Sequence, residues 1–316
     1  MEPLLSTISD LKTFSDVKNP FLRMLDMSFQ FFRNAKSSDL ILIDVYSTRN
    51  FYYAFVISGL SWAFSKKFVL LLHGGYLPKR LLQSPIIFNF MLKNAFEISA
   101  PSNYLKSIFE EKGFRVSLLP NCIDQTKFTF LERTSFKPNL LYVRGFGSLY
   151  NPMMAVKAIG MLKVKFPEIK LIMYGYEDLS ELLSIQNYIQ KEDLSSNIEI
   201  HKNTSRESWV ANSIHSDIMI SCPEIDNTPL SILEGMALGL AIISTNVGGI
   251  PFLLTQHKNA ILIPFNNELE LANAVESLIN YPNKTHSMTL QAKKTLENYT
   301  WNTVKPLWEN LFDRAS

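Results

Sequence analysis

Cysteine is scarce in this sequence. Cys122 and Cys222 are the only two among 316 residues. Two cysteines cannot build the disulfide framework of a small secreted domain, and these two lack the close spacing of a metal-binding pair. The opening residues, MEPLLSTISDLKTF, also lack the basic start and apolar core of a secretory signal. We therefore expect a protein of a reducing compartment, cytoplasmic by default.

Long apolar runs are missing as well. The most membrane-like stretch is FYYAFVISGLSWAF, at 51–64, and Lys66 and Lys67 follow it. A helix that spans a bilayer needs about 20 apolar residues, so this stretch is too short. We expect it to form a buried or interfacial helix.

A large excess of charge is a third feature that the sequence lacks. The formal net charge is +2, which is too small to predict nucleic-acid binding. The distribution is uneven, because residues 1–137 hold 17 Lys/Arg against 11 Asp/Glu, and residues 138–316 hold 14 against 18. The basic first half is compatible with an anionic membrane surface or a phosphorylated acceptor, and equally with ordinary solvated surface.

Short, continuous apolar runs are plentiful. Continuous rather than alternating apolar character over four to six residues indicates strands that are covered on both faces, as in a parallel sheet. The runs are LILIDV (40–45), FVLLL (68–72), FEISA (96–100), RVSLLP (115–120), NLLYV (139–143), IKLIMY (169–174), IEIHK (198–202), DIMIS (217–221), LAIIS (240–244) and AILIP (260–264).

Helical patterns separate these strands. Residues 151–167, NPMMAVKAIGMLKVKFP, place apolar side chains at helical spacing between the runs at 139–143 and 169–174. Alternating strands and helices predict right-handed βαβ units and an α/β fold with doubly wound sheets.

The length and the 47% apolar content suffice for two such domains. A polar segment without periodicity, 132–139, predicts a boundary, so we expect domains at 1–135 and 138–300. Residues 301–316 contain WNTVKPLWENLF and predict a docked C-terminal helix. Two doubly wound domains in tandem would leave a cleft between the carboxyl edges of their sheets, where ligands of such folds bind.

The stretch CPEIDNTPLSILEGMALGLAIISTNVGGIP, at 222–251, carries the clearest chemistry. It follows a predicted strand, Thr228 is suited to cap a helix, and Pro229 fits a first helical turn. Leu230, Leu233 and Ala237 then predict a buried stripe that ends at Gly239.

Two acids flank this predicted helix start. Asp226 precedes it, and Glu234 lies inside it by roughly 7–8 Å along the axis. Because a helix N-terminus favours anions, the acids would bracket an anion site. Such a site suits a nucleotide sugar, with one acid on sugar hydroxyls, the other on ribose, and the diphosphate between them. The alternative is that Asp226 only caps the helix and Glu234 is an exposed helix residue.

The segment from Asp226 to Pro251 resembles the signature of family-4 glycosyltransferases (glycosyltransferases group 1), in which an acid, seven residues and a Glu precede a small-residue helix and a Gly-Gly-x-Pro loop. Residues 100–124 and 140–175 are similar to the family's domain junction, and LLLHGG at 70–75 to its histidine loop. The resemblance implies the GT-B architecture, two Rossmann-like domains whose parallel sheets face each other across a cleft.

The resemblance also implies roles for single residues. Glu234 would bind the donor ribose, Asp226 would lie beside the transferred sugar where the family usually has Glu, and Arg144 would bind the diphosphate. His73 would line the donor or acceptor site. Structural alternatives are a surface ion pair for Arg144 and a purely structural His73. The implied catalytic set is His73, Arg144, Asp226 and Glu234. The implied donor-binding set is Arg144, Asp226, Asn227, Thr228, Pro229, Leu230, Glu234, Gly248 and Gly249.

Two features depart from the family pattern. Leu149, Tyr150 and Asn151 occupy the region where the family has a second phosphate-binding Lys. The family also opens with a strand and a Gly-rich loop, whereas the first strand predicted here is at 40–45, so the chain is expected to be short at its N-terminus.

The resulting functional hypothesis is a retaining glycosyltransferase. It would move a sugar from a nucleoside-diphosphate sugar to a glycan or lipid-linked acceptor in cell-surface polysaccharide synthesis, with peripheral contact to an anionic membrane. No metal, cofactor or nucleic-acid partner is expected. The alternatives are a nucleotide-sugar epimerase on the same fold, and a non-catalytic or truncated nucleotide-binding relative.

Overall fold

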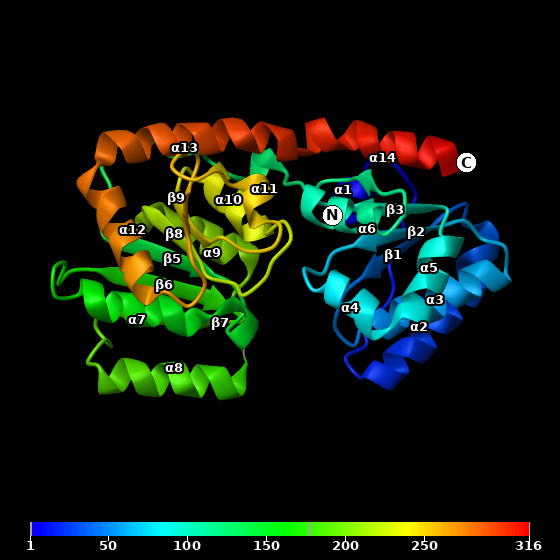
Figure 1. Cartoon of the computed structure of the whole chain (residues 1–316), viewed down its shortest axis with the longest axis horizontal. Coiled ribbons are helices and arrows are strands. Elements are labelled where there is room, and N and C mark those ends of the chain that lie inside the picture. Colours follow the sequence, from blue (N-terminus) through cyan, green and yellow to red (C-terminus); the bar gives the residue numbers. More distant parts are fainter. Residues whose placement is uncertain (1, 177, 316) are drawn as a thin grey trace. The chain divides into compact units, whose positions relative to one another are not determined.

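The computed structural model describes residues 2–176 and 178–315, and the chain forms two compact units (Figure 1). Unit 1 comprises Met1–Cys122 together with Trp301–Ser316, and unit 2 comprises Ile123–Thr300. Each unit is built around its own parallel sheet. All ten apolar runs form strands at the predicted places.

Unit 1 has a four-stranded parallel sheet with the order β1-β2-β3-β4. Its strands are β1 (Ile41–Val45), β2 (Phe68–Leu72), β3 (Glu97–Ala100) and β4 (Ser117–Leu118). Its helices are α1 (Glu2–Leu5), α2 (Pro20–Asn34), α3 (Phe51–Ala63), α4 (Leu77–Gln83), α5 (Pro85–Asn94), α6 (Asn103–Glu111) and α14 (Trp301–Ala315), with 3₁₀ turns η1 (Ala35–Ser37) and, at the start of unit 2, η2 (Gln125–Lys127).

The two faces of this sheet are covered by different helices. Successive strand residues point to opposite faces. Leu70 of β2 therefore packs in the cluster formed with α2 to α6, whereas Val69 and Leu71 pack against Trp308 of α14. The C-terminal helix is thus part of the core of unit 1, as the prediction that it docks requires.

Residues 51–64 form α3 and its last turn, as predicted. Phe51, Ala54 and Ile57 are buried in the unit 1 core, while Trp62 and Phe64 are exposed. Across the described ranges, 2–176 and 178–315, every helix falls short of the length and apolar character needed to cross a membrane.

Unit 2 has a six-stranded parallel sheet with the order β10-β9-β8-β5-β6-β7. Its strands are β5 (Asn139–Val143), β6 (Lys170–Gly175), β7 (Ile198–Lys202), β8 (Ile218–Ser221), β9 (Ala241–Thr245) and β10 (Ile261–Ile263). The chain runs outward from β5 to β7, returns beside β5, and runs outward again from β8 to β10. This is the doubly wound order of dinucleotide-binding domains.

Helices cover both faces of this sheet. They are α7 (Pro152–Leu162), α8 (Leu179–Lys191), α9 (Arg206–Asn212), α10 (Leu230–Ala237), α11 (Ile250–Leu253), α12 (Glu268–Asn280) and α13 (Pro282–Leu296), with 3₁₀ turns η3 (Ser148–Tyr150), η4 (Ser213–His215) and η5 (Glu297–Tyr299). Figure 1 shows α7, α8 and α12 on one side and α10 and α13 on the other. Ile218 and Ile220 of β8 face the first group, and Met219 faces the second.

The division between the units lies earlier than the boundary predicted at 132–139. Ile123 bridges to Thr300, and the buried Arg133 pairs with Asp217 through a 3.0 Å contact. These interactions attach the residues after Cys122 to unit 2, although their polar, aperiodic sequence is typical of a linker.

Candidate functional site

The strand order of unit 2 reverses between β5 and β8. Loops that leave the carboxyl ends of the two strands at such a reversal diverge and form a ligand-binding crevice. Arg144 directly follows β5, and the loop at 222–229 follows β8. The structure therefore brings Arg144 and Asp226, 82 positions apart in the sequence, into an ion pair at this edge.

The backbone and ring contacts of Arg144 fix its position. Its N–H donates to the carbonyl of Tyr174 at 3.0 Å, and its guanidinium lies over the ring of Tyr150, 5.1 Å from the centroid. A Cβ on Gly175 would come within 2.1 Å of the Arg144 carbonyl, so glycine is required there. Tyr150, in the region where the family has a second Lys, thus supplies an aromatic support for Arg144.

The glycine pair after β9 holds the acidic loop. Gly249 donates its N–H to the carbonyl of Asp226 at 2.9 Å. A Cβ on Gly248, whose φ is +54°, would meet that same carbonyl at 2.2 Å, and a Cβ on Gly249 would meet the Asn227 carbonyl at 2.1 Å. Gly248 and Gly249 therefore permit a close approach to the loop at Asp226, rather than only a tight turn.

Helix α10 begins one residue later than predicted. Pro229 is the N-cap, with φ −66° and ψ 118°, in place of Thr228, because its extended ψ places it outside the helix while its carbonyl accepts from Ile232 at 3.2 Å. Leu230, predicted in the buried stripe, is 42% exposed. As the first helical residue it lies at the edge of the sheet, where no core covers it. Leu233 and Ala237 are buried as predicted.

Polar atoms without partners gather at this helix start. Within the residues that the structure describes, the Nε of Arg144 and the Oγ of Ser231 are buried and make no hydrogen bond. The first N–H groups of a helix have no intrahelical acceptor either. Unpaired buried donors are costly, so this cluster is suited to an anionic ligand that accepts hydrogen bonds from them.

Glu234 lies one turn inside α10 and is buried, so the alternative of an exposed helix residue does not hold. One of its oxygens pairs with Arg206 at 2.6 Å. Burial raises the pKa of Glu234 to about 7, although the charges of Arg206 and Arg144 and the hydrogen bond from Arg206 act in the opposite direction. The alternative in which Asp226 caps the helix also fails, because Pro229 caps it and Asp226 pairs with Arg144.

Arg206 is a site residue that the sequence did not predict. It is the first residue of α9, and its guanidinium lies over the ring of Phe128, 5.1 Å from the centroid. Ser205 as the N-cap was the only local signal, and it indicates a helix start and no more. Since the carboxyl ends of parallel strands share one edge, the loop after β7 could have been expected near Glu234.

His73 belongs to unit 1, whereas the other predicted site residues lie in unit 2. It directly follows β2, and its Nε2 lies 2.8 Å from the Oδ1 of Asp44 on β1. Its ring stacks on that of Tyr46 at a centroid distance of 5.4 Å. His73 therefore lies at the predicted carboxyl edge of the unit 1 sheet, held by neighbours on β1 and the loop after it.

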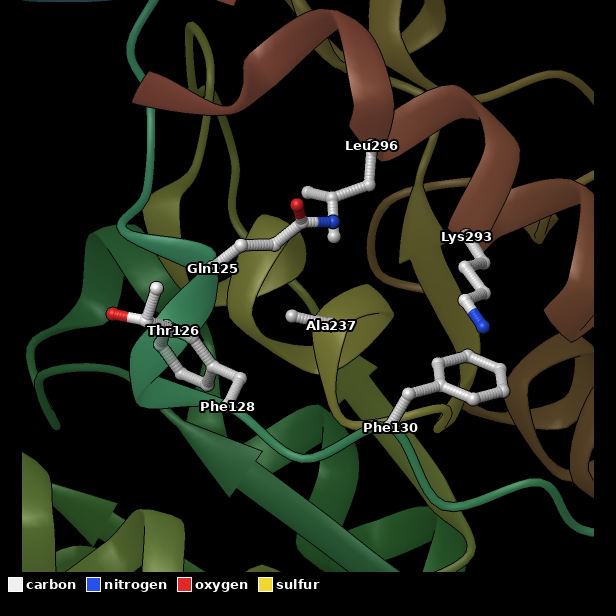
Figure 2. Close-up of a pocket in the computed structure, with 7 residues that line it drawn as sticks. All are labelled: Gln125, Thr126, Phe128, Phe130, Ala237, Lys293 and Leu296. Carbon is white, nitrogen blue, oxygen red and sulfur yellow. The ribbon is translucent and has the colours of Figure 1, made fainter. Parts of the chain in front are cut away.

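A cavity of about 260 Å³ lies elsewhere in unit 2 and contains none of the predicted site residues (Figure 2). Figure 2 shows Phe128 and Phe130 after η2 on one side and Lys293 of α13 above Phe130. Phe128 is shared, because it lines the cavity and also supports Arg206. Over residues 2–176 and 178–315, the His, Cys, Asp and Glu side chains form no cluster of three that could hold a metal ion.

Among curated proteins, the chain is similar to two glycosyltransferases. It is 25% identical over 170 residues to a D-inositol 3-phosphate glycosyltransferase from Paenarthrobacter aurescens, covering 52% of this chain and 40% of that protein. It is 24% identical over 213 residues to a human phosphatidylinositol N-acetylglucosaminyltransferase protein, covering 64% and 41%. The matched part of the chain spans about two fifths of each relative's length.

Solved structures show the same fold. The Anabaena protein Alr3699/HepE, solved with UDP-glucose, superposes with a TM-score of 0.80 at 15% identity, covering 99% of this chain and 88% of that one. Sucrose-phosphate synthase from Thermosynechococcus elongatus gives 0.79 at 14% identity, covering 96% and 80%. The fold is therefore that of the GT-B glycosyltransferases, as expected. The family model described as "Glycosyl transferases group 1" matches residues 125–295, more than half of the chain, and the chain belongs to that family.

Proposed function

We propose that this protein is a glycosyltransferase that binds a nucleoside-diphosphate sugar in unit 2, between Asp226 and Glu234. The observation that carries the proposal is the cluster at the start of α10, where Arg144 and both acids converge with two buried polar atoms that have no partner among the described residues. This cluster lies where the strand order reverses, as the ligand sites of doubly wound folds do.

The diphosphate is proposed to bind Arg144 and the N-terminus of α10. Arg144 holds Asp226 with one terminal nitrogen, while its Nε remains available to a phosphate oxygen. The Oγ of Ser231 and the first helical N–H groups supply further donors. These groups would stabilise the nucleoside diphosphate as the sugar–oxygen bond breaks, without an obligatory metal ion or cofactor.

The acids are proposed to bind hydroxyls on either side of the diphosphate. Glu234 would accept hydrogen bonds from the ribose, and Arg206 would act as a positioning residue that keeps its carboxylate ionised and oriented. Asp226, fixed by Arg144 and the glycine pair, would bind the transferred sugar. For His73 we propose a role in binding the acceptor within unit 1, with Asp44 fixing its ring.

The finer features of the reaction belong to the same proposal. We propose retention of the anomeric configuration and a glycan or lipid-linked acceptor, in the synthesis of a cell-surface polysaccharide at an anionic membrane. One similar curated protein is named for phosphatidylinositol, which favours a lipid-linked acceptor. A solved structure of the same fold contains UDP-glucose, which favours a nucleotide-sugar donor.

The test begins with a thermal-shift screen of nucleoside-diphosphate sugars, because a ligand that binds only the folded protein raises its stability. Calorimetry with the best donor should then show that Asp226→Ala and Glu234→Ala lose at least tenfold in affinity. Glu224→Ala, which removes an exposed acid from the same loop, should bind like the wild type. Unchanged affinity in both site variants would contradict the proposal. Conversion of the donor sugar without an acceptor would indicate an epimerase instead.

A further inference from the structure

Helix α2 carries an apolar face that the core does not use. On its inner side, Phe31 is buried and Met27 packs against the unit 1 core. On the outer side, five apolar side chains are each more than half exposed. They are Phe21 (71%), Leu22 (54%), Leu25 (52%), Phe29 (62%) and Phe32 (54%). At 3.6 residues per turn these five side chains fall within an arc of about 100°.

The exposed surface continues onto the end of α3. The ring of Phe64 lies 5.5 Å from that of Phe32 and 6.0 Å from that of Phe31, and Phe64 is itself 55% exposed. We call these six exposed residues, the five on α2 and Phe64, the α2 face. Single exposed apolar residues are common, but a contiguous group of this kind marks a surface that binds something.

Basic residues border the α2 face. Arg33 is exposed on α2 next to Phe32, Lys36 is exposed just after the helix, and Lys18 is exposed just before it. Residues 12–36 contain five Lys/Arg and two Asp, so this segment contributes to the positive charge of the first half of the chain. An apolar face with Phe and Leu, flanked by Lys and Arg, is typical of helices that lie in a membrane interface.

We propose that the α2 face docks onto an anionic lipid bilayer, with α2 lying in the plane of the interface. The aromatic and leucine side chains would enter the boundary between headgroups and acyl chains, and the flanking Lys and Arg would contact lipid phosphates. A second copy of this chain fits less well, because a two-fold contact through this face would bring the two basic borders together.

This inference relocates the membrane contact suggested by the apolar run at 51–64. Most of that run is used within unit 1, and only its last turn adds Phe64 to the exposed surface. The inference rests on the proposed membrane setting, but its test contains no nucleotide sugar. Failure of the donor experiments therefore leaves the vesicle result unaffected, and the reverse also holds.

The first experiment is co-sedimentation of the full chain with vesicles of phosphatidylcholine alone or mixed with phosphatidylglycerol. Wild type should bind the anionic vesicles, less so at high salt, and Leu25→Gln/Phe29→Gln should lose at least tenfold. The control is Leu183→Gln, which changes a leucine that is 59% exposed on α8. Absence of wild-type binding, or equal binding by the double variant, would overturn the proposal.

A second measurement reports on the α2 face directly. Both native cysteines are buried, so Phe29→Cys provides a single accessible thiol for an environment-sensitive dye. The dye emission should increase and shift to the blue on anionic vesicles, and a dye on Leu183→Cys should not respond. No response at residue 29 would overturn the proposal. A wild-type dimer that Phe29→Gln converts to monomer in ultracentrifugation would assign the face to a second copy instead.

Discussion

At the residue scale, the protonation of Glu234 links stability to pH. Its pKa is raised from an ordinary value of 4.5 to about 7, chiefly by burial. Between these values the folded protein holds a proton that the unfolded chain has lost. The contribution of Glu234 to the free energy of unfolding therefore falls as pH rises from about 4.5 to about 7, and the cost of its ionisation persists above that range.

Replacement by glutamine removes this cost. Because the raised pKa corresponds to about 3 kcal/mol at most, Glu234→Gln should be more stable than wild type at pH 8, by up to that amount. The two proteins should converge near pH 4, where Glu234 is protonated in both states. Urea denaturation at several pH values measures the difference, and a gap that does not change with pH would contradict the assignment.

Arg206 should control the pH at which Glu234 becomes able to bind ribose. Arg206→Ala removes the nearby positive charge, so the pKa of Glu234 should rise further and the midpoint of donor affinity should move up by on the order of one pH unit. Arg206→Lys should restore part of the shift. Calorimetric titrations from pH 5.5 to 8.5 measure the midpoint. A uniform loss of affinity at every pH would indicate that Arg206 only stabilises the fold.

The sequence could predict the acids but not their cationic partners. Asp226 and Glu234 lie in one short motif with a fixed spacing around a helix start, so local pattern suffices to find them. Arg206 reaches Glu234 because the loops after β7 and β8 share one edge of the sheet. That proximity depends on strand order, which no short stretch of sequence encodes.

At the element scale, the loop after β8 depends on the glycine pair after β9. Gly249→Ala would place a Cβ about 2.1 Å from the Asn227 carbonyl, so the acidic loop must move. We expect a loss of about 2 kcal/mol in the free energy of unfolding and weaker donor binding. Chemical denaturation and calorimetry measure both.

The control is Gly59→Ala in α3, where nothing lies within 4 Å of the added carbon. It should stabilise the protein by up to about 1 kcal/mol, because alanine favours a helix more than glycine does. If Gly249→Ala behaved in the same way, the glycine pair would not be holding the loop.

Most elements could be predicted because their signals are local. Buried parallel strands read as continuous apolar runs, and all ten were found. The start of α10 and the exposure of Leu230 were predicted wrongly. Both depend on where the helix meets the edge of the sheet, which periodicity alone cannot show.

At the scale of the whole molecule, each unit is completed by chain from a distant part of the sequence. Helix α14 packs against Val69 and Leu71 of unit 1, and the segment after Cys122 is attached to unit 2 by Ile123 and Arg133. A composition change at 132–139 indicated a linker, but the actual division is set by these long-range pairs. The fold class was predictable from local alternation, whereas the division of the chain was not.

The central claim is that the start of α10 in unit 2 binds the diphosphate of a nucleotide sugar. The most direct measurement is a crystal structure of the protein with the donor nucleotide identified by the thermal-shift screen. The account predicts phosphate oxygens within about 3 Å of the Arg144 Nε and the Ser231 Oγ, with the ribose hydroxyls on Glu234. A nucleotide bound elsewhere, for example in the cavity beside Lys293, with the Arg144 Nε still unpaired, would contradict it.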